Sequence, residues 1–390
     1  MKRKLTLLLS LTLIVSISFI LGCNLFKSSS HKDDYFPIFE VEADNYYDLG
    51  FAIGQQFAEN IQLAITRQAE LSAIIANIIS IDSVYFYENL LAKAEELYPD
   101  LVDEIRGMSD GSGVEFETLV RLNLFGDIIA LYYGLAGETD LDIPESLLGC
   151  STVSYNYNGT QYLAHNEDGM AQLHDLMSVI KVSMPGKPDF MNLYYPGLLC
   201  GIAPSLNDEG LAFSGNYIQS ASGVPSGVPH LFVFATLLEA ETVDEAISII
   251  VNTLTCNDLH VNIASGIENR VVSVEKAENT AVVHEVEGLY AHTNHFIQDA
   301  MLGFPTDDDP TTHERYTTLM GLIATYTDNL ADVDCDVLYD FLCDVAAEPD
   351  TTGGITGGMT LGTSLFNMET GNWELFFNNP ADKISKNFHF

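Results

Sequence analysis

The sequence predicts an α+β fold in which two sheets are covered by helices on their outer faces. Over residues 41–140, apolar residues recur at helical intervals, whereas from Cys150 onward short segments alternate or carry β-branched residues. Helical patterns return at 229–254 and at about 313–326 and 334–346, and strand patterns close the chain. This order of helices, strands, helices and strands is what two packed sheets with outer helices require.

The individual elements follow from the same periodicities. Apolar residues at intervals of four predict one helix over 46–68. Further helices are expected at 85–97, 101–108 and 116–135. Asn158-Gly159 predicts a hairpin turn between the first two strands. Strands are expected at 152–157, 161–165, 177–184, 210–214, 261–264, 270–275, 280–285, 289–292, 359–366 and 372–377.

The first 40 residues are expected to lie outside this fold. A basic stub at 2–4 precedes an uncharged run that ends in Leu21-Gly22-Cys23. The pattern is typical of a lipoprotein signal peptide over 1–22, with a lipidated Cys23 and a flexible tether over 23–40. A membrane helix is the alternative, although the run is near the lower length limit for spanning. We therefore expect an exported protein that is anchored by lipid to the outer face of a membrane.

Composition narrows the classes of partner. The chain has 55 Asp and Glu against 16 Lys and Arg, a formal net charge of −39, which argues against a nucleic-acid partner. No C-x-x-C pair is present, and His292-x-x-His295 lacks the helical H-E-x-x-H spacing, so neither a metal nor a cofactor is expected. A bond between Cys335 and Cys343, which flank a predicted helix segment, is left open.

One catalytic motif is present by pattern only. Residues 107–111 match the G-x-S-x-G serine elbow. The elbow needs a strand before the serine and a helix after it. Here a helix precedes and a glycine-rich loop is expected to follow, so the segment is interpreted as a helix C-cap.

The informative pattern begins at the junction of the two halves, at Gly149-Cys150. Asp168 follows in His165–Gly169, and Asn216, Asn294 and Arg315 come later in 215–217, 292–296 and 312–316. With 195–199 (YPGLL) and 207–211 (NDEGL), these residues resemble the acyl-CoA:6-aminopenicillanic-acid acyltransferase family of N-terminal nucleophile (Ntn) hydrolases. The resemblance covers about 45–390 and is nearest to the β-alanyl-amine hydrolase branch.

The resemblance implies a four-layer αββα sandwich without a cofactor. It also implies a cut before Cys150 that gives an α-chain over 41–149 and a β-chain over 150–390, which stay associated. Two residues depart from the family pattern: Cys200 stands where Pro is expected, and His230 stands where relatives commonly carry Arg. Both departures concern the substrate pocket.

The expected chemistry rests on one residue. Cys is the strongest side-chain nucleophile at neutral pH. A free α-amine, with a pKa of about 7.7–8.0, would serve as base for its own thiol. Gly149 would ease the N-to-S acyl shift because glycine adopts strained backbone conformations cheaply.

The other site residues are expected to position charge around Cys150. Asp168 would hold the α-ammonium, and the Asn294 side-chain amide would stabilise the oxyanion. Asn216 would add a second donor through its backbone, and Arg315 would orient Asn294 or bind a carboxylate.

The sequence thus predicts hydrolysis or acyl transfer of a linear, non-peptide amide through a thioester on Cys150, with a small-molecule amide as the substrate. Two alternatives stay open. One is an ester hydrolase or phospholipase-B-like lipid hydrolase on the same scaffold. The other is a catalytically silent envelope lipoprotein that uses the cleft for capture.

Overall fold

The computed structural model describes residues 35–136, 149–306, 311–347 and 358–390. Residues 36–390 form one compact unit. Cys23, the signal segment and most of the tether lie outside the described residues. The end of the expected tether is wrong, because β1 (Ile38–Glu42) pairs with β4 (Ser178–Ser183) and Phe36 is buried in the core. Within the described part of the chain, no single helix is long and apolar enough to cross a membrane, and two bent pairs of helices pass that test only together.

The first part of the unit is mainly helical, as expected. Its helices are α2 (Tyr46–Gln56), α3 (Ala58–Arg67), α4 (Ala69–Ile81), η1 (Val84–Glu88), α5 (Asn89–Leu97), α6 (Pro99–Ser112), α7 (Phe116–Asn123) and α8 (Phe125–Ala136). The single helix expected at 46–68 is two helices, because the Phe57 backbone leaves helical values with φ −109° and ψ 19°.

Later helices are α9 (His230–Leu237), α10 (Val243–Asn252), α11 (Thr312–Ala324) and α12 (Cys335–Val345), with short turns η3 (Ala171–Leu173), η4 (Leu330–Asp332) and η5 (Pro380–Asp382). The helical stretch expected at 229–254 is divided. Thr242 caps α10 by accepting a hydrogen bond from the Glu245 backbone, which starts a new helix there.

Among the described residues, the strands form two sheets. Sheet A runs in the order β1 (Ile38–Glu42), β4 (Ser178–Ser183), β5 (Phe190–Tyr194), β6 (Ser205–Asn207), β7 (Leu211–Asn216), β8 (Leu259–Ser265), β9 (Arg270–Ala277), β10 (Thr280–Glu285). Sheet B runs β11 (Gly288–His292), β2 (Cys150–Tyr157), β3 (Thr160–Met170), β12 (Gly358–Asn367), β13 (Asn372–Phe377), β14 (Ser385–Phe388). All pairs are antiparallel except β1 with β4.

The sequence missed four strands. Strand β5 is buried on both faces and shows no alternation, and β6 has only three residues. The strands β1 and β14 lie at sheet edges, where few side chains are buried. Each therefore lacks the period-two signal on which the prediction depends.

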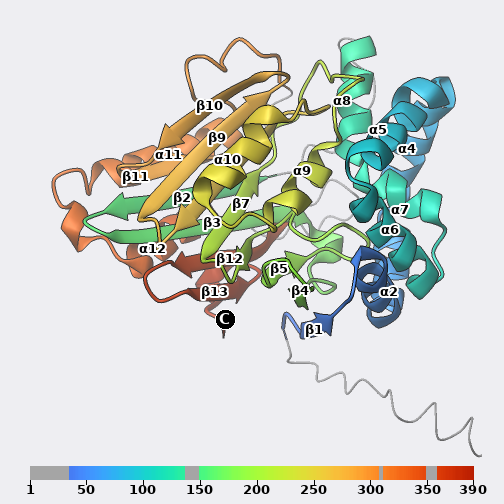
Figure 1. Cartoon of the computed structure of the whole chain (residues 1–390). Coiled ribbons are helices and arrows are strands. Elements are labelled where there is room, and N and C mark those ends of the chain that lie inside the picture. The colour runs from blue at the N-terminus through green and yellow to red at the C-terminus, as the bar shows by residue number, and fades with distance from the viewer. Residues whose placement is uncertain (1–34, 137–148, 307–310, 348–357) are drawn as a thin grey trace, which may run out of the picture. The chain divides into compact units, whose positions relative to one another are not determined.

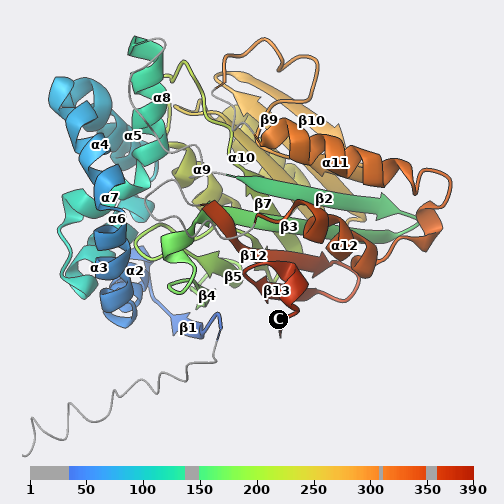
Figure 2. The same ribbon diagram turned by 180° about the vertical axis from the view of Figure 1, so that it is seen from behind.

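The layers are helix, sheet, sheet and helix. Residues such as Leu163 and Trp373 of sheet B pack against Val179 and Val271 of sheet A in the core between the sheets. Helices α9 and α10 cover the outer face of sheet A (Figure 1), and α11 and α12 cover the outer face of sheet B (Figure 2). The αββα sandwich is confirmed.

Helices α2 and α6 cross through glycines. A Cβ on Gly50 would lie 1.8 Å from the Glu104 carbonyl oxygen, and one on Gly107 would lie 2.0 Å from that of Tyr47. The G-x-S-x-G segment therefore lies inside α6 and forms part of a helix crossing. The expected C-cap there is wrong: α6 continues to Ser112 and ends at Gly113, whose φ of +71° suits glycine.

The cysteine pair left open by the sequence is not bonded. Cys335 and Cys343 both lie in α12 and are free thiols. Eight residues of helix rise about 12 Å. Their Cα atoms are therefore farther apart than the roughly 7 Å that a disulfide allows.

Candidate active site

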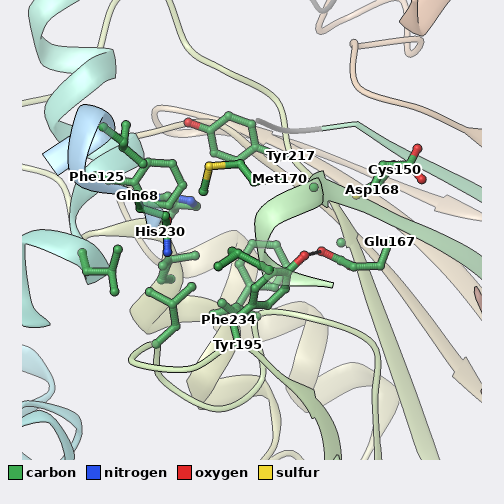
Figure 3. A pocket seen from close by; sticks show the side chains of 18 residues that line it. Gln68, Phe125, Cys150, Glu167, Asp168, Met170, Tyr195, Tyr217, His230 and Phe234 are labelled. Atoms are coloured by element: carbon green, nitrogen blue, oxygen red, sulfur yellow. Dashed lines mark hydrogen bonds between the residues drawn. The ribbon is translucent and has the colours of Figure 1, made fainter. Parts of the chain in front are cut away.

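A cavity of about 110 Å³ lies where the ends of β2 and β3 face the helical part of the chain (Figure 3). We call one side the strand wall, formed by Cys150, Glu167, Asp168, Gly169 and Met170. The other side is the helix wall, formed by Gln68, Leu71, Leu122, Phe125, His230, Leu231 and Phe234. Tyr195 and Tyr217 lie between them in the close-up.

Cys150 is the first residue of β2 and is 5% exposed. It pairs with Glu167 on β3. Its backbone N–H donates to Asn294 Oδ1 at 2.7 Å. The nitrogen that a cut would convert to an α-amine is therefore already held by a side chain.

Asn294 is fixed by contacts at each of its polar atoms. Its Oδ1 accepts from both Cys150 and Arg315, and its Nδ2 donates to the Tyr217 carbonyl at 2.9 Å. The reverse orientation would set the Nδ2 donors against two N–H donors, so the network fixes the amide. The structure thus places the Asn294 oxygen at Cys150, whereas the oxyanion role expected for its amide group stays a prediction.

Arg315 reaches the same point from α11. Its Nη2 donates to Asn294 Oδ1 at 2.8 Å, and its Nη1 donates to the Cys150 carbonyl at 2.6 Å and to Ser151 Oγ at 2.9 Å. Of the two roles that the sequence left open for Arg315, these contacts favour the orientation of Asn294.

Asp168 and Gly149 are joined across the two strands. The Asp168 backbone N–H donates to the Gly149 carbonyl at 2.9 Å, and Asp168 Oδ1 accepts from Thr360 Oγ1 at 2.6 Å. Gly149 does not have a positive φ, and its expected part in the acyl shift stays a prediction. A Cβ on Gly149 would lie 3.4 Å from that of Asp168, an ordinary van der Waals contact, so packing here does not require glycine.

Two consecutive residues of β3, Glu167 and Asp168, line one cavity, although side chains alternate along a regular strand. Beside them the pairing with β12 shifts between Thr360 and Gly362, so the extra residue, Leu361, lies on β12. The ladder is therefore irregular at this point of the sheet.

Electrostatics disfavour the thiolate in this chain. Burial, and then the Glu167 and Asp168 carboxylates, raise the pKa of the Cys150 thiol well above its ordinary value. The Asp168 backbone N–H and Arg315 lower it by less. A nearby base is therefore needed to take the proton from sulfur.

The Asn216 side chain faces a different set of partners. Its Oδ1 accepts from Thr152 Oγ1 at 2.8 Å and from His260 Nδ1 at 3.0 Å. Burial, with His292 and His165 adding to it, holds the pKa of His260 well below its ordinary value. The Asn216 side chain is thus part of a buried neutral network that joins β2, β7 and β8, and its expected backbone role stays a prediction.

The loop that carries Asn294 is anchored from sheet A. Glu275 on β9 accepts from His292 Nε2 at 2.8 Å and from the backbone N–H groups of Ile297 and Gln298. The Asn294 backbone donates to Thr312 Oγ1 at the start of α11. These contacts hold the loop from both sides. Sequence reasoning missed Glu275 because its contacts with the loop appear only when the sheets pack.

Further residues beside the pocket were not singled out as site residues from the sequence. Glu167 accepts from Tyr195 Oη at 2.7 Å and lies 3.2 Å from His165 Nε2. Buried Asp127, on α8, is 2.9 Å from His230 Nδ1. The signal available in the sequence was the spacing of His165 and Glu167, which places both side chains on one face of a strand.

Cys150, His165 and Glu167 are the described residues whose ligand-type atoms lie close together, within 4.8 Å of one another. His165 Nδ1 lies 2.8 Å from Thr152 Oγ1 and its Nε2 lies near Glu167, so both ring nitrogens already have partners. The arrangement fits a hydrogen-bonded group better than a ligand set.

Comparisons with curated proteins find two relatives. The chain is 28% identical over 227 residues to a beta-alanyl-dopamine/carcinine hydrolase of Drosophila melanogaster, covering 53% of this chain and 54% of that protein. It is 21% identical over 180 residues to protein dcd1A of Dictyostelium discoideum, covering 44% of this chain and 39% of that protein. The chain thus matches about half the length of these relatives, or less.

Many solved structures are similar at low identity, among them the two that follow. One is a conjugated bile acid hydrolase mutant from Clostridium perfringens, with 14% identity and a TM-score of 0.45, covering 62% of this chain and 92% of that chain. The other is a Caenorhabditis elegans N-acylethanolamine-hydrolyzing acid amidase ortholog, with 13% identity and a TM-score of 0.41, covering 56% and 93%.

The family comparison covers more of the chain. The model of the acyl-coenzyme A:6-aminopenicillanic acid acyl-transferase family matches residues 155–382, which is more than half of the sequence. The match begins shortly after Cys150 and includes Asp168, Asn216, Asn294 and Arg315. The resemblance seen in the sequence is confirmed, and the chain belongs to the acyl-coenzyme A:6-aminopenicillanic acid acyl-transferase family.

Proposed function

We propose that this chain is an enzyme that hydrolyses the C–N bond of a linear, non-peptide amide, or transfers its acyl group, through a thioester on Cys150. Family membership supports the reaction class. The observation that carries the proposal is the clamp at Cys150. The nitrogen is held by Asn294 and the carbonyl by Arg315, while the residue itself lines a largely apolar cavity.

The first event would be self-cleavage. The Cys150 sulfur attacks the Gly149 carbonyl carbon, and the Gly149–Cys150 peptide bond breaks as the acyl group passes from nitrogen to sulfur. The Asp168 N–H on the Gly149 oxygen would stabilise the charge that develops there. Water then hydrolyses the thioester, which leaves a free α-amine on Cys150 and a carboxylate on Gly149.

The mature reaction would reuse the same atoms. The α-amine takes the thiol proton, and sulfur attacks the substrate carbonyl to give a tetrahedral intermediate. The proton passes to the substrate nitrogen and the amine departs, leaving a thioester. Water or a second amine takes the acyl group. In this scheme Asn294 and Arg315 fix the α-amine, and Asp168 lies beside it.

The substrate class is proposed from the relative and the pocket together. The curated relative with the higher identity is a beta-alanyl-dopamine/carcinine hydrolase. Three carboxylates, those of Asp127, Glu167 and Asp168, lie on or just behind the cavity walls, and no Lys or Arg is among the described residues that line it. We propose an amide that releases an aromatic amine.

The test combines intact-mass analysis of the purified protein with an assay of amine release. Purified wild-type protein should give two fragments whose masses correspond to a cut between Gly149 and Cys150, and the Cys150→Ala variant should stay whole. Cys200→Ala, at another buried thiol, is the matched control and should be cut. Wild type should release amine from β-alanyl-dopamine or carcinine. A chain that stays whole and silent on both amides would contradict the proposal.

We also propose, from the leader pattern alone, that the enzyme is exported and anchored through lipid on Cys23. Mass spectrometry of protein extracted from membranes should find a lipidated Cys23 as the first residue. The Cys23→Ala variant should retain residues 1–22 and lack the lipid. Unmodified Cys23 in the native host would contradict the anchor without affecting the proposed chemistry.

A further inference from the structure

The helix wall holds one polar atom that lacks a partner. His230 lines the cavity, is 1% exposed, and its Nε2 has no hydrogen-bond partner among the described residues. Burial of a polar atom without a partner is destabilising. In Figure 3, His230 lies on the opposite side of the cavity from Cys150. The atom is therefore buried and unsatisfied at the end of the pocket remote from the thiol.

Asp127 fixes the orientation of this ring. The Asp127 Oδ1 accepts from the His230 backbone N–H at 3.1 Å, and its Oδ2 lies 2.9 Å from His230 Nδ1. A carboxylate can only accept, so Nδ1 carries a proton; in the neutral form of the ring, the lone pair is then on Nε2. Asp127 is itself fully buried. The pair thus presents a hydrogen-bond acceptor to the cavity.

The surroundings suit an aromatic ring. The Tyr217 ring centroid lies 5.5 Å from that of His230, and the Phe234 centroid lies 6.5 Å away, nearly perpendicular. Phe125 and Leu122 complete this end. The volume of about 110 Å³ is of the same order as engineered apolar cavities of about 150 Å³ that take a benzene ring.

We propose that His230 Nε2 is a specificity-determining acceptor for a hydrogen-bond donor on an aromatic ring of the substrate, such as a phenolic hydroxyl or a ring N–H. This inference rests on the proposed amide-cleaving function and adds a subsite to it. His230 would contact the aromatic ring of the substrate, and Asp127 would orient His230. Neither residue takes part in bond making. A ring without a donor would leave Nε2 unsatisfied, which is why discrimination is expected.

The test uses three matched rings that differ at one position. Phenyl, 4-hydroxyphenyl and 4-pyridyl groups are compared, carried on the amine side as β-alanyl amides of the arylethylamines. A second series carries the same rings on the acyl side as 3-arylpropanoyl amides. In the series whose ring reaches His230, wild type should prefer hydroxyphenyl over phenyl by about 10- to 100-fold in kcat/KM, mainly through KM.

Asp127→Asn gives the sharper outcome. The Asn Oδ1 must still accept from the His230 backbone, so its Nδ2 faces His230 Nδ1 and moves the ring proton to Nε2. The wall then presents a donor. The phenol oxygen can still accept from it, so the preference for hydroxyphenyl over phenyl should shrink, whereas pyridyl, which can only accept, should become preferred over phenyl by about 10-fold. Asp258→Asn, at a buried carboxylate outside the pocket lining, is the control and should keep the wild-type ratios.

Binding of the same amides to the Cys150→Ala variant, measured by calorimetry, separates the two proposals. Discrimination in binding without turnover by wild type would contradict the proposed function and keep the subsite. Turnover with equal use of all three rings in both series would overturn the subsite. So would an Asp127→Asn effect no larger than that of Asp258→Asn.

Discussion

The two walls of the pocket differ in how their polar atoms are satisfied. On the strand wall, Cys150 and the two carboxylates are tied to Asn294, Arg315, Thr360 and Tyr195 by short hydrogen bonds. The helix wall is apolar apart from Gln68 and His230, and His230 keeps one nitrogen without a described partner. A saturated network holds groups in one geometry. A buried atom without a partner can form a hydrogen bond with a ligand. We therefore expect the chemistry to lie with the strand wall and the substrate selectivity with the helix wall.

The largest effect should come from the strand wall. Arg315→Lys replaces a fork that spans Asn294 and Cys150 with a single ammonium. We expect a loss of about 10²- to 10³-fold in kcat/KM, together with slow or absent self-cleavage. Steady-state kinetics and intact mass would measure both. Arg121→Lys, in a surface pair with Glu117, is the control, and equal losses in the two variants would break the assignment.

A buried acid in the helical part gives a pH test. Burial raises the pKa of Glu104, on α6, from 4.5 to about 8. Between these values the folded chain holds a proton that the unfolded chain has lost, so the free energy of unfolding falls as pH rises. Relative to Glu104→Gln, the parent should lose roughly 3 kcal/mol between pH 5 and pH 9, as urea unfolding would measure. Glu70→Gln, at an exposed site, should leave the pH profile of the parent unchanged.

The helix crossing offers a test of stability without chemistry. Gly107→Ala would force a Cβ against the Tyr47 carbonyl and should lower the free energy of unfolding by about 2 kcal/mol. Gly321→Ala, on α11 with nothing within 4 Å, should raise it by about 0.5–1 kcal/mol. Thermal melts would compare them. If both substitutions stabilised the protein, close contact between α2 and α6 would be refuted.

The smallest effect tests the link between the walls. Tyr195→Phe removes the hydroxyl that donates to Glu167 while keeping the ring. Loss of one such bond costs about 1 kcal/mol, so kcat/KM should fall by about 3- to 10-fold. Tyr157→Phe, on the exposed end of β2, serves as the control. A loss as large as that of Arg315→Lys would mean that Glu167 takes part in the reaction itself.

Much of the fold could be predicted from local patterns. Most helices of the first part and the strands with alternating or β-branched sequences lie where the contrast between apolar and polar residues placed them, whereas α4 was not predicted. The missed strands carry no such contrast: β5 is buried on both faces, and β1 and β14 are largely exposed edges. The serine-elbow pattern at 107–111 lies at a helix crossing. The spacing of its glycines did not reveal this, because it does not show which segment packs against them.

The sequence by itself determined the family, the helical and strand-rich halves, and the candidates Cys150, Asp168, Asn294 and Arg315. Tertiary structure alone decided that Cys150 and Arg315, 165 residues apart, share a hydrogen bond, and that Asn294 turns its oxygen to the Cys150 nitrogen. It also decided that Glu167 and Asp168 line one cavity, and that Asp127 holds His230 through Nδ1. Burial and hydrogen-bond partners arise only when distant segments pack. They determine the orientation and the electrostatic surroundings of a polar residue, which the sequence alone does not show.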